Sequence, residues 1–189
     1  MNETLPICEA GKVVWKTSFA CDSDTLAIWD YETQTGSIGF AVDALPENPG
    51  AWDDGCRLNF NDNSGYSSGP NGSSAATATS PAIELGLSEG DDAELHVGFW
   101  EWIDIDNQDG TDIRRVGLVS DAGLVLAEKE LPDDPAQNQV WVYREVVFTL
   151  GGADTTVRLR FSFDSVDEKD NEGKGWFIDR LVVSSQKLN

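Results

Sequence analysis

Two clusters of acidic residues have side chains that could bind a metal ion. The first occupies the segment DIDNQDGTD and contains Asp104, Asp106, Asp109 and Asp112. Carboxylate oxygens are the ligands that Ca²⁺ prefers, and their close spacing predicts a calcium loop. A solvated acidic turn is the alternative, because Gly110 stands one position late for an EF-hand and no Glu occupies the twelfth place.

The second acidic cluster lies between two segments that alternate as strands do. It begins with Asp164 and Asp167, continues through residues 168–172, and leads to Asp179 in the next strand. Acids at two converging strand ends would form a closer cage for a cation than a single turn does. A polar loop is again the alternative.

Catalytic motifs are absent from the sequence. His96 is the only histidine, and no GxSxG, HExxH or glycine-rich phosphate loop occurs. We therefore interpret His96 as a solvated or hydrogen-bonded strand residue. A hydrolase that uses two carboxylates remains the alternative, because 34 Asp and Glu residues allow close pairs.

Trp100 and Trp102 stand two positions apart, which places both indoles on one face of a strand. Exposed indole faces bind the apolar C–H surface of sugars, so this face is a candidate ligand platform. Packing in the core is the alternative fate of both rings. We expect Arg158 or Arg160 nearby, donating hydrogen bonds to the ligand's hydroxyl or carboxylate groups.

Composition limits the classes of partner. The chain has 189 residues, 40% of them apolar, so it can bury a sizeable core. Its formal net charge of −21 repels nucleic acid and anionic membranes. The sequence contains no run of 18 apolar residues, which is the length that a membrane-spanning helix needs. Three cysteines without metal-ligand spacing favour a disulfide and an oxidising compartment. We predict the pair Cys21–Cys56, which leaves Cys8 in the N-terminal tail.

Period-2 alternation, interrupted by Gly, Pro, Asn and Asp, indicates an all-β chain. It predicts a core face for Leu95, Val97 and Phe99 in one strand and for Val157, Leu159, Phe161 and Phe163 in another. The segment Leu124–Leu131 has mixed helix propensity and ends before Pro132. We predict a single domain over 12–186, with tails at 1–11 and 187–189. The predicted strands are Lys12–Phe19, Gly36–Val42, Cys56–Phe60, Ala75–Leu85, Ala93–Ile105, Asp112–Ser120, Gln139–Leu150, Thr155–Ser165 and Gly175–Ser185.

Three segments, taken in order, resemble MAM-like jelly rolls of secreted bacterial proteases and extracellular receptors, and more distantly the jelly-roll carbohydrate-binding modules. They are TSPAIEL at Thr79–Leu85, the aromatic hairpin at Leu95–Gly123, and GWFIDRLVV at Gly175–Val183. The resemblance implies a two-sheet antiparallel sandwich that Gly175–Val183 closes, with Ile178 and Leu181 buried.

The same resemblance implies a structural Ca²⁺ ion held by Asp179. In these jelly rolls the corresponding acid meets the end of the first strand, where a Glu commonly follows Phe. Here Ala20 follows Phe19, and Arg180 replaces the second acid of the closing strand. We therefore expect Asp22 and Asp24 to supply the missing oxygens, together with Asp164.

These observations predict a secreted or cell-surface binding or adhesion module that is stabilised by Ca²⁺ and lacks catalytic activity. Its expected partner is a glycan or an extracellular protein. A carboxylate-based glycoside hydrolase or lyase on the same scaffold is the alternative.

Overall fold

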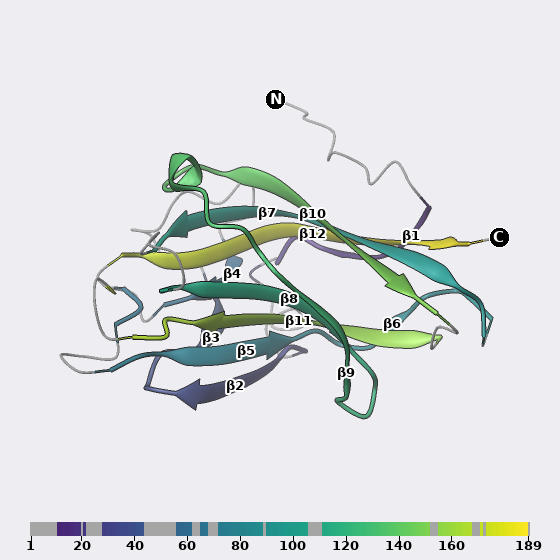
Figure 1. Cartoon of the computed structure of the whole chain (residues 1–189), viewed down its shortest axis with the longest axis horizontal. Helices are drawn as coiled ribbons and strands as arrows, with labels where there is room; N and C mark the ends of the chain where they lie inside the picture. Colours follow the sequence, from purple (N-terminus) through teal and green to yellow (C-terminus); the bar gives the residue numbers. More distant parts are fainter. Residues whose placement is uncertain are drawn as a thin grey trace.

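The chain folds into two antiparallel β-sheets that pack face to face, as the computed structural model shows (Figure 1). The structure describes residues 11–19, 21, 28–43, 56–61, 65–67, 72–88, 90–105, 111–151, 155–167, 171 and 173–188. Within these ranges the only helical element is a 3₁₀ turn, η1 (Pro135–Gln137). The predicted all-β jelly-roll sandwich is therefore confirmed. No helix in the described part is long and apolar enough to cross a membrane.

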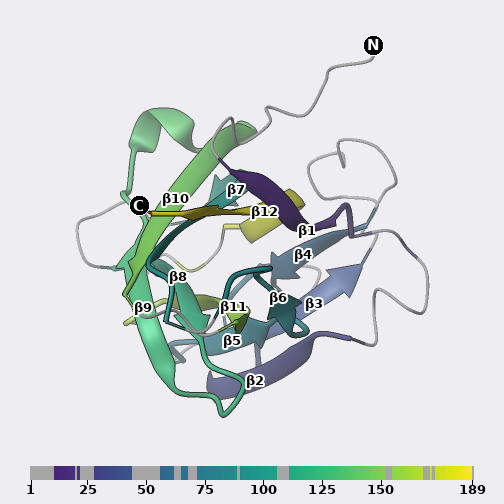
Figure 2. The same cartoon turned by 90° about the vertical axis from the view of Figure 1, so that its right-hand side faces the viewer.

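The first sheet, sheet A, contains the longest strands. Strand β12 lies near its centre, between β7 on one side and β4 on the other, and β1 pairs with the remaining length of β12. Figure 2 shows β7, β10 and β12 together on one side of the sandwich. In spatial order the path is β10 (Val142–Leu150), β7 (Ala93–Asp104), β12 (Gly175–Lys187), β4 (Arg57–Phe60) and β3 (Phe40–Asp43), with β1 (Lys12–Thr17) beside β12.

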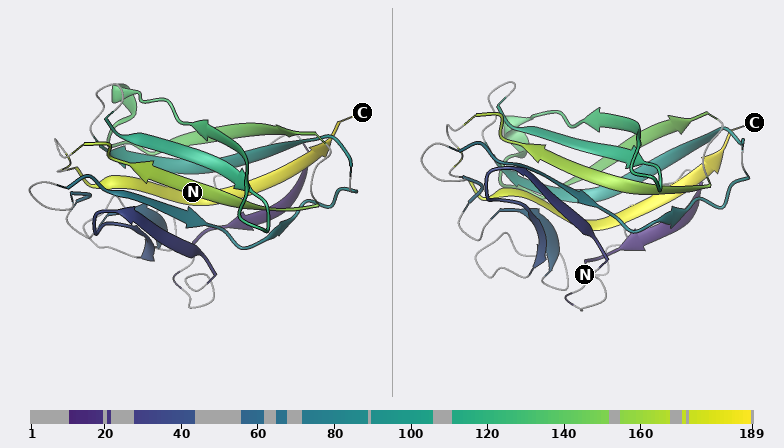
Figure 3. Two further views of the ribbon diagram at one scale, coloured as in Figure 1. Left: turned by 60° about the horizontal axis from the view of Figure 1, so that its bottom comes forward. Right: turned by 90° about the horizontal axis from the view of Figure 1, so that it is seen from below.

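The second sheet, sheet B, has β11 at its centre. Edge strands β2 and β9 bound it, and the short β6 pairs with the start of β11. Figure 3 shows this sheet from two further directions. Its path is β2 (Asp30–Thr35), β5 (Ala75–Thr79), β11 (Thr156–Asp164), β8 (Ile113–Val119) and β9 (Val125–Glu130), with β6 (Ile83–Glu84) off the path.

The hydrophobic core lies between the sheets, and alternation predicted its main residues correctly. The inward sets of β7 and β11 are buried, as are Ile178 and Leu181 of β12. Phe99 of sheet A meets Phe161 of sheet B edge to face, with ring centroids 5.4 Å apart. Phe161 also contacts Trp176 at 5.7 Å. Aromatic contacts of this kind join the two sheets across the core.

Several strand boundaries differ from the predictions. The segment of mixed helix propensity forms β9, because it pairs with β8 and places Ala127 against the core. Strand β2 was not predicted, since DYETQT is polar and exposed throughout at the sheet edge. Strand β10 begins at Val142 rather than at Gln139, which adopts a positive φ of 60°. Strand β12 extends to Lys187, one residue beyond the predicted domain end.

The predicted disulfide between Cys21 and Cys56 is present in the structure, with the two Cα atoms 5.2 Å apart. It joins residues 35 positions apart in the sequence, from the chain after β1 to the start of β4. By loop-closure entropy, a crosslink of this span stabilises the fold by about 3–4 kcal/mol.

Candidate ligand-binding site

The outer face of sheet B carries an open, polar hollow. Strand β11 turns Arg158 and Arg160 to this face, because Val157, Leu159 and Phe161 occupy the inward positions. The hollow measures about 400 Å³ and also has Asp30 and Glu32 of β2 in its wall. Its remaining lining residues are Thr77, Thr79, Val119, Asp121, Ala122 and Gly123.

Carboxylates on two sides hold Arg158 in place. Its Nε and Nη2 atoms donate to Asp121 Oδ1 at 3.1 and 3.0 Å. Its Nη1 lies 3.6 Å from Asp30 Oδ2 and donates to the Ser80 carbonyl at 3.4 Å. The guanidinium therefore has a fixed orientation although the side chain is about a quarter exposed.

Arg160 lies one row further along the same face. Its Nη2 donates to Glu128 Oε1 of β9 at 2.9 Å. In the sheet register Arg160 stands beside Thr79 of β5, and Thr79 stands beside Asp30 of β2. Guanidinium, hydroxyl and carboxylate groups thus follow one another across adjacent strands of a rigid sheet.

A tight turn between β8 and β9 closes one end of the hollow. The Gly123 N–H donates to the Ser120 carbonyl at 2.9 Å, and the Leu124 N–H donates to Ser120 Oγ at 3.2 Å. Gly123 has a positive φ of 81°, which glycine adopts at little cost. The turn carries Asp121, and Val119 pairs with Val125 at its base.

The arrangement suits a ligand that is rich in hydroxyl groups. Oriented groups of both charge signs line the hollow beside threonine side chains, and such groups can exchange hydrogen bonds with the hydroxyls of a sugar. Among the residues that the structure describes, no aromatic side chain lines this hollow.

The expectation that Arg158 or Arg160 lies near the face of Trp100 and Trp102 is wrong. Trp100 and Trp102 point away from the core on sheet A, whereas Arg158 and Arg160 point away from it on sheet B. The thickness of the sandwich separates the two pairs. Alternation assigns faces within a strand, but it does not say which sheet the strand joins.

The tryptophans also lack open ring faces of the expected kind. Trp102 is only 8% exposed and packs edge to face on Phe177 of β12, with centroids 5.4 Å apart. Trp100 is half-buried and contacts its cross-strand neighbour Tyr143 at 5.9 Å. Packing, the alternative fate of both rings, therefore describes these contacts better than a platform.

The structure describes two of the four members of the first acidic cluster, Asp104 and Asp112. Asp104 accepts hydrogen bonds from Gln139 Nε2 at 2.9 Å and from the Lys174 N–H at 3.0 Å. Asp112 is buried and accepts a 2.6 Å hydrogen bond from the Tyr66 hydroxyl. Asp106 and Asp109 lie outside the described residues.

The second cluster does not converge on Asp179. Asp164 lies on the outer face at the end of β11 in sheet B, where its Oδ1 accepts the Val166 N–H at 2.9 Å. Asp167, whose carbonyl accepts from Asn171 Nδ2 at 2.8 Å, follows in the same turn. Asp179 belongs to the outer side of sheet A. The expected cage of Asp164 with Asp179 is therefore wrong, because the sandwich lies between them.

Asp179 is fully buried, next to a bulge in β12. Its Oδ1 accepts the Arg180 N–H at 2.7 Å, and Arg180 has a positive φ of 48°. The end of β1 lies close by, since Thr17 pairs with Leu181. Asp22 and Asp24 lie outside the described residues. Within the described ranges, no three His, Cys, Asp or Glu side chains come together as a metal site.

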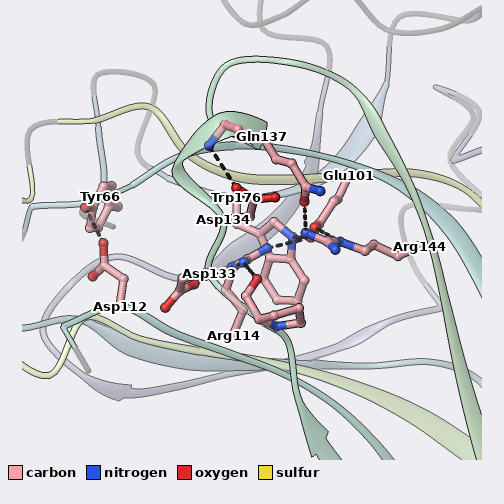
Figure 4. A network of polar contacts seen from close by, with 11 residues as sticks. Tyr66, Glu101, Asp112, Arg114, Asp133, Asp134, Gln137, Arg144 and Trp176 are labelled. Atoms are coloured by element: carbon pink, nitrogen blue, oxygen red, sulfur yellow. Dashed lines mark hydrogen bonds and ion pairs between the residues drawn. The ribbon is translucent and has the colours of Figure 1, made fainter. Parts of the chain in front are cut away.

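Sequence reasoning missed a buried ion-pair cluster centred on Glu101 (Figure 4). Glu101 Oε2 accepts hydrogen bonds from Arg114 Nη1 at 2.7 Å and from Trp176 Nε1 at 3.0 Å, and Arg144 pairs with Oε1. Arg144 also bonds Gln137. The cluster joins β7, β8, β10 and β12 across the core. The sequence did carry a signal for this cluster: Glu101 is an acid at the next inward position of β7 after Leu95, Val97 and Phe99.

His96 forms hydrogen bonds on a strand, as interpreted from the sequence. It is mostly buried, and its Nδ1 lies 3.0 Å from Glu145 Oε1 on β10. Its Nε2 lies 3.7 Å from Glu94 Oε2. The contact with Glu145 ties β7 to β10, whereas Glu94 lies on the same strand as His96.

Comparisons with known proteins show similarity of fold only. No protein-family model matches the sequence, and no curated protein matches it. An arabinose-bound α-L-arabinofuranosidase aligns with 93% of this chain at 14% identity and a TM-score of 0.53. The glycoside hydrolase domain of Endo-D from Streptococcus pneumoniae aligns with 82% at 12% identity and a TM-score of 0.50. The chain spans 26% and 21% of those two chains.

A third solved structure matches over nearly its whole length. The xylan-binding domain from Paenibacillus barcinonensis Xyn10C aligns over 98% of its chain and 95% of this one, at 12% identity and a TM-score of 0.49. At these identities the similarity concerns the β-sandwich and does not extend to a site.

Proposed function

We propose that the chain is a non-catalytic glycan-binding module and that the hollow on the outer face of sheet B is its binding site. The observation that carries the proposal is Arg158, fixed between Asp30 and Asp121 in an open hollow beside threonine hydroxyls. Groups that are already oriented lose little side-chain entropy when they bind a sugar's hydroxyls.

The comparisons support this choice of ligand class. Two solved structures of similar fold are carbohydrate-acting enzymes, and the chain corresponds to about a quarter or less of each. A module of this size fits an accessory role beside a larger carbohydrate-acting protein.

The chemistry of the acids favours binding over catalysis. Two of the acids that line the hollow are paired with Arg158: Asp121 accepts its hydrogen bonds, and Asp30 forms an ion pair with it at 3.6 Å. The buried Glu101 carboxylate is closed off from substrate by two arginines and Trp176. A glycosidase needs two accessible carboxylates that flank one bond.

An extracellular location is also part of the proposal. The Cys21–Cys56 disulfide suits an oxidising compartment. The net charge of −21 makes neutral polysaccharides better partners than nucleic acids or anionic surfaces.

A glycan array with the native chain and an Arg158→Ala variant tests the proposed function. We expect binding of neutral glycans by the native chain, at least a tenfold weaker signal for the variant, and no hydrolysis of the bound glycans. Turnover of a bound glycan would favour the enzyme alternative. Absence of every glycan signal, or a variant that binds as the native chain does, would refute the proposed site.

We also propose that Ca²⁺ stabilises the fold through Asp179, with Asp22 and Asp24 as further ligands. The support is one fully buried carboxylate near the end of β1, because a buried charge is costly without a counterion or hydrogen bonds. The competing explanation is the hydrogen bond that Asp179 accepts from the Arg180 N–H.

Thermal melting in EDTA and in excess Ca²⁺ separates the two explanations. With a Kd of about 10⁻⁴ M, Ca²⁺ at about 1 mM adds roughly 1.4 kcal/mol, which raises Tm for the native chain. The Asp179→Asn variant should melt at one temperature in both conditions. Superimposed native curves, with no calcium found by elemental analysis, would exclude the ion.

A further inference from the structure

A second hollow adjoins the first on the far side of the β8–β9 turn. It measures about 340 Å³ and is lined by Ser120, Asp121, Ala122, Thr155 and Thr156. Asp121 and Ala122 also line the first hollow. Because Asp121 and Ala122 line both hollows, the hollows adjoin at this turn, and we call these two shared residues the ridge.

Asp121 is held so that it can serve both hollows. Its Oδ1 atom accepts both hydrogen bonds from Arg158, whose guanidinium lies in the first hollow. Within the described part of the chain, no hydrogen bond to its Oδ2 is found. The carboxylate therefore has a fixed orientation and an acceptor oxygen available to a ligand on the ridge.

The ridge is rigid because the turn is internally hydrogen-bonded. Besides the two bonds to Ser120 from Gly123 and Leu124, the Ser120 N–H donates to the Leu124 carbonyl at 2.8 Å. The turn closes a hairpin whose strand β8 pairs with the centre of sheet B. A ligand that spans both hollows meets a preformed surface.

The polar groups of the second hollow continue those of the first. Ser120, Thr155 and Thr156 supply hydroxyls, and Ala122 supplies a methyl group. Hydroxyls donate and accept, as sugar hydroxyls do, and carry no charge. This lining fits one further neutral sugar unit rather than a charged group.

We propose that the two hollows are consecutive subsites of one groove, which binds internal segments of a linear neutral oligosaccharide across Asp121. This inference rests on the proposed glycan-binding function. It predicts that affinity rises with chain length, because a short sugar fills one hollow and a longer one fills both.

Isothermal titration with neutral β-1,4-linked oligosaccharides of xylose, glucose and mannose, from two to six units, tests the inference. For the native chain we expect at least tenfold tighter binding of the hexasaccharide than of the disaccharide in one of these series. The double variant Thr155→Val/Thr156→Val keeps side-chain volume but removes two hydroxyls. It should bind the hexasaccharide more weakly than the native chain does, so that most of the length dependence is lost.

Two further variants complete the test. Asp121→Ala removes the ridge acceptor and should weaken binding of long and short chains alike. Glu130→Gln, which alters an exposed pair with Arg115 on the same face outside both hollows, should bind as the native chain does. Equal native affinity at every length, or an unchanged length dependence in the threonine variant, overturns the two-subsite inference alone. Absence of binding in all three series overturns the inference together with glycan binding.

Discussion

The same pairing of an arginine with a carboxylate occurs in two very different surroundings in this molecule. In the core, Arg114 and Glu101 approach to 2.7 Å with side chains 0% and 2% exposed. On the outer face of sheet B, Arg158 and Asp121 approach to 3.0 Å with side chains 27% and 67% exposed. The distances are similar, and burial is what distinguishes the pairs.

Burial decides which role each pair has. Removing one partner of a buried pair leaves a charge without a counterion in a medium of low dielectric constant, which is strongly destabilising. An exposed pair contributes little to stability because water solvates both charges. Its groups remain oriented and accessible, which is what a binding surface requires.

The largest loss of stability is expected for the Glu101→Gln variant. This change leaves Arg114 and Arg144 without their shared carboxylate, so unfolding in urea should show a loss of about 3–5 kcal/mol. The matched exposed change, Glu130→Gln, should cost less than about 1 kcal/mol. Similar losses in the free energy of unfolding for both variants would show that burial does not determine how much each pair stabilises the fold.

The two tryptophans extend the comparison to apolar groups. Trp102→Ala should lower the free energy of unfolding by about 3 kcal/mol or more, because a nearly buried ring on Phe177 is removed. Trp100→Ala should cost less, since its ring is half-buried. Both variants should retain native glycan affinity in titration. Loss of binding in either one would return the site to sheet A.

Arg158→Ala should change stability by less than about 1 kcal/mol while weakening glycan binding about tenfold or more. Urea unfolding and titration of the same preparation measure the two effects together. The control is Arg115→Ala, which removes an exposed guanidinium outside both hollows. An equal loss of affinity in that control would indicate a general charge effect.

The smallest expected effect on stability concerns the surface ion pair of Asp91 with Lys187. The hydrogen bond from Lys187 Nζ at 2.8 Å, with a further one from the Ser88 N–H, lowers the pKa of Asp91 from its ordinary 3.8. Because the folded-state pKa is the lower one, the contribution to stability is present above the unfolded value. It is lost as the pH falls through the folded value.

Urea unfolding of the native chain and of Asp91→Asn should therefore differ slightly at neutral pH and converge in acid. A difference that persisted in acid would assign the effect to something other than the charge.

Sequence alternation predicted the core because inward and outward residues repeat every second position in β7 and β11. The fold class and the Cys21–Cys56 pair were also accessible from sequence. Strand β9 was not, because its pairing with β8 outweighs local helix propensity. Strand β2 has no apolar side to reveal it.

The candidate site was accessible only in part. Alternation identified Arg158 and Arg160 as outward-facing, but the hollow also depends on Asp30, Thr79 and Asp121, which come from three other segments. Which strands become neighbours is a property of the sheet topology. Glu101 stands at an inward position and was overlooked, although an acid there requires buried partners.

The position of β12 has a consequence for biosynthesis. Residues 175–187 leave the ribosome after every other described strand of the two sheets, yet they lie between β7 and both β4 and β1. Sheet A therefore cannot close while this segment is still inside the exit tunnel, and the inward faces of the earlier strands stay uncovered until then. Pairing of β1 with β12 must close a loop of most of the chain, a step that slows folding.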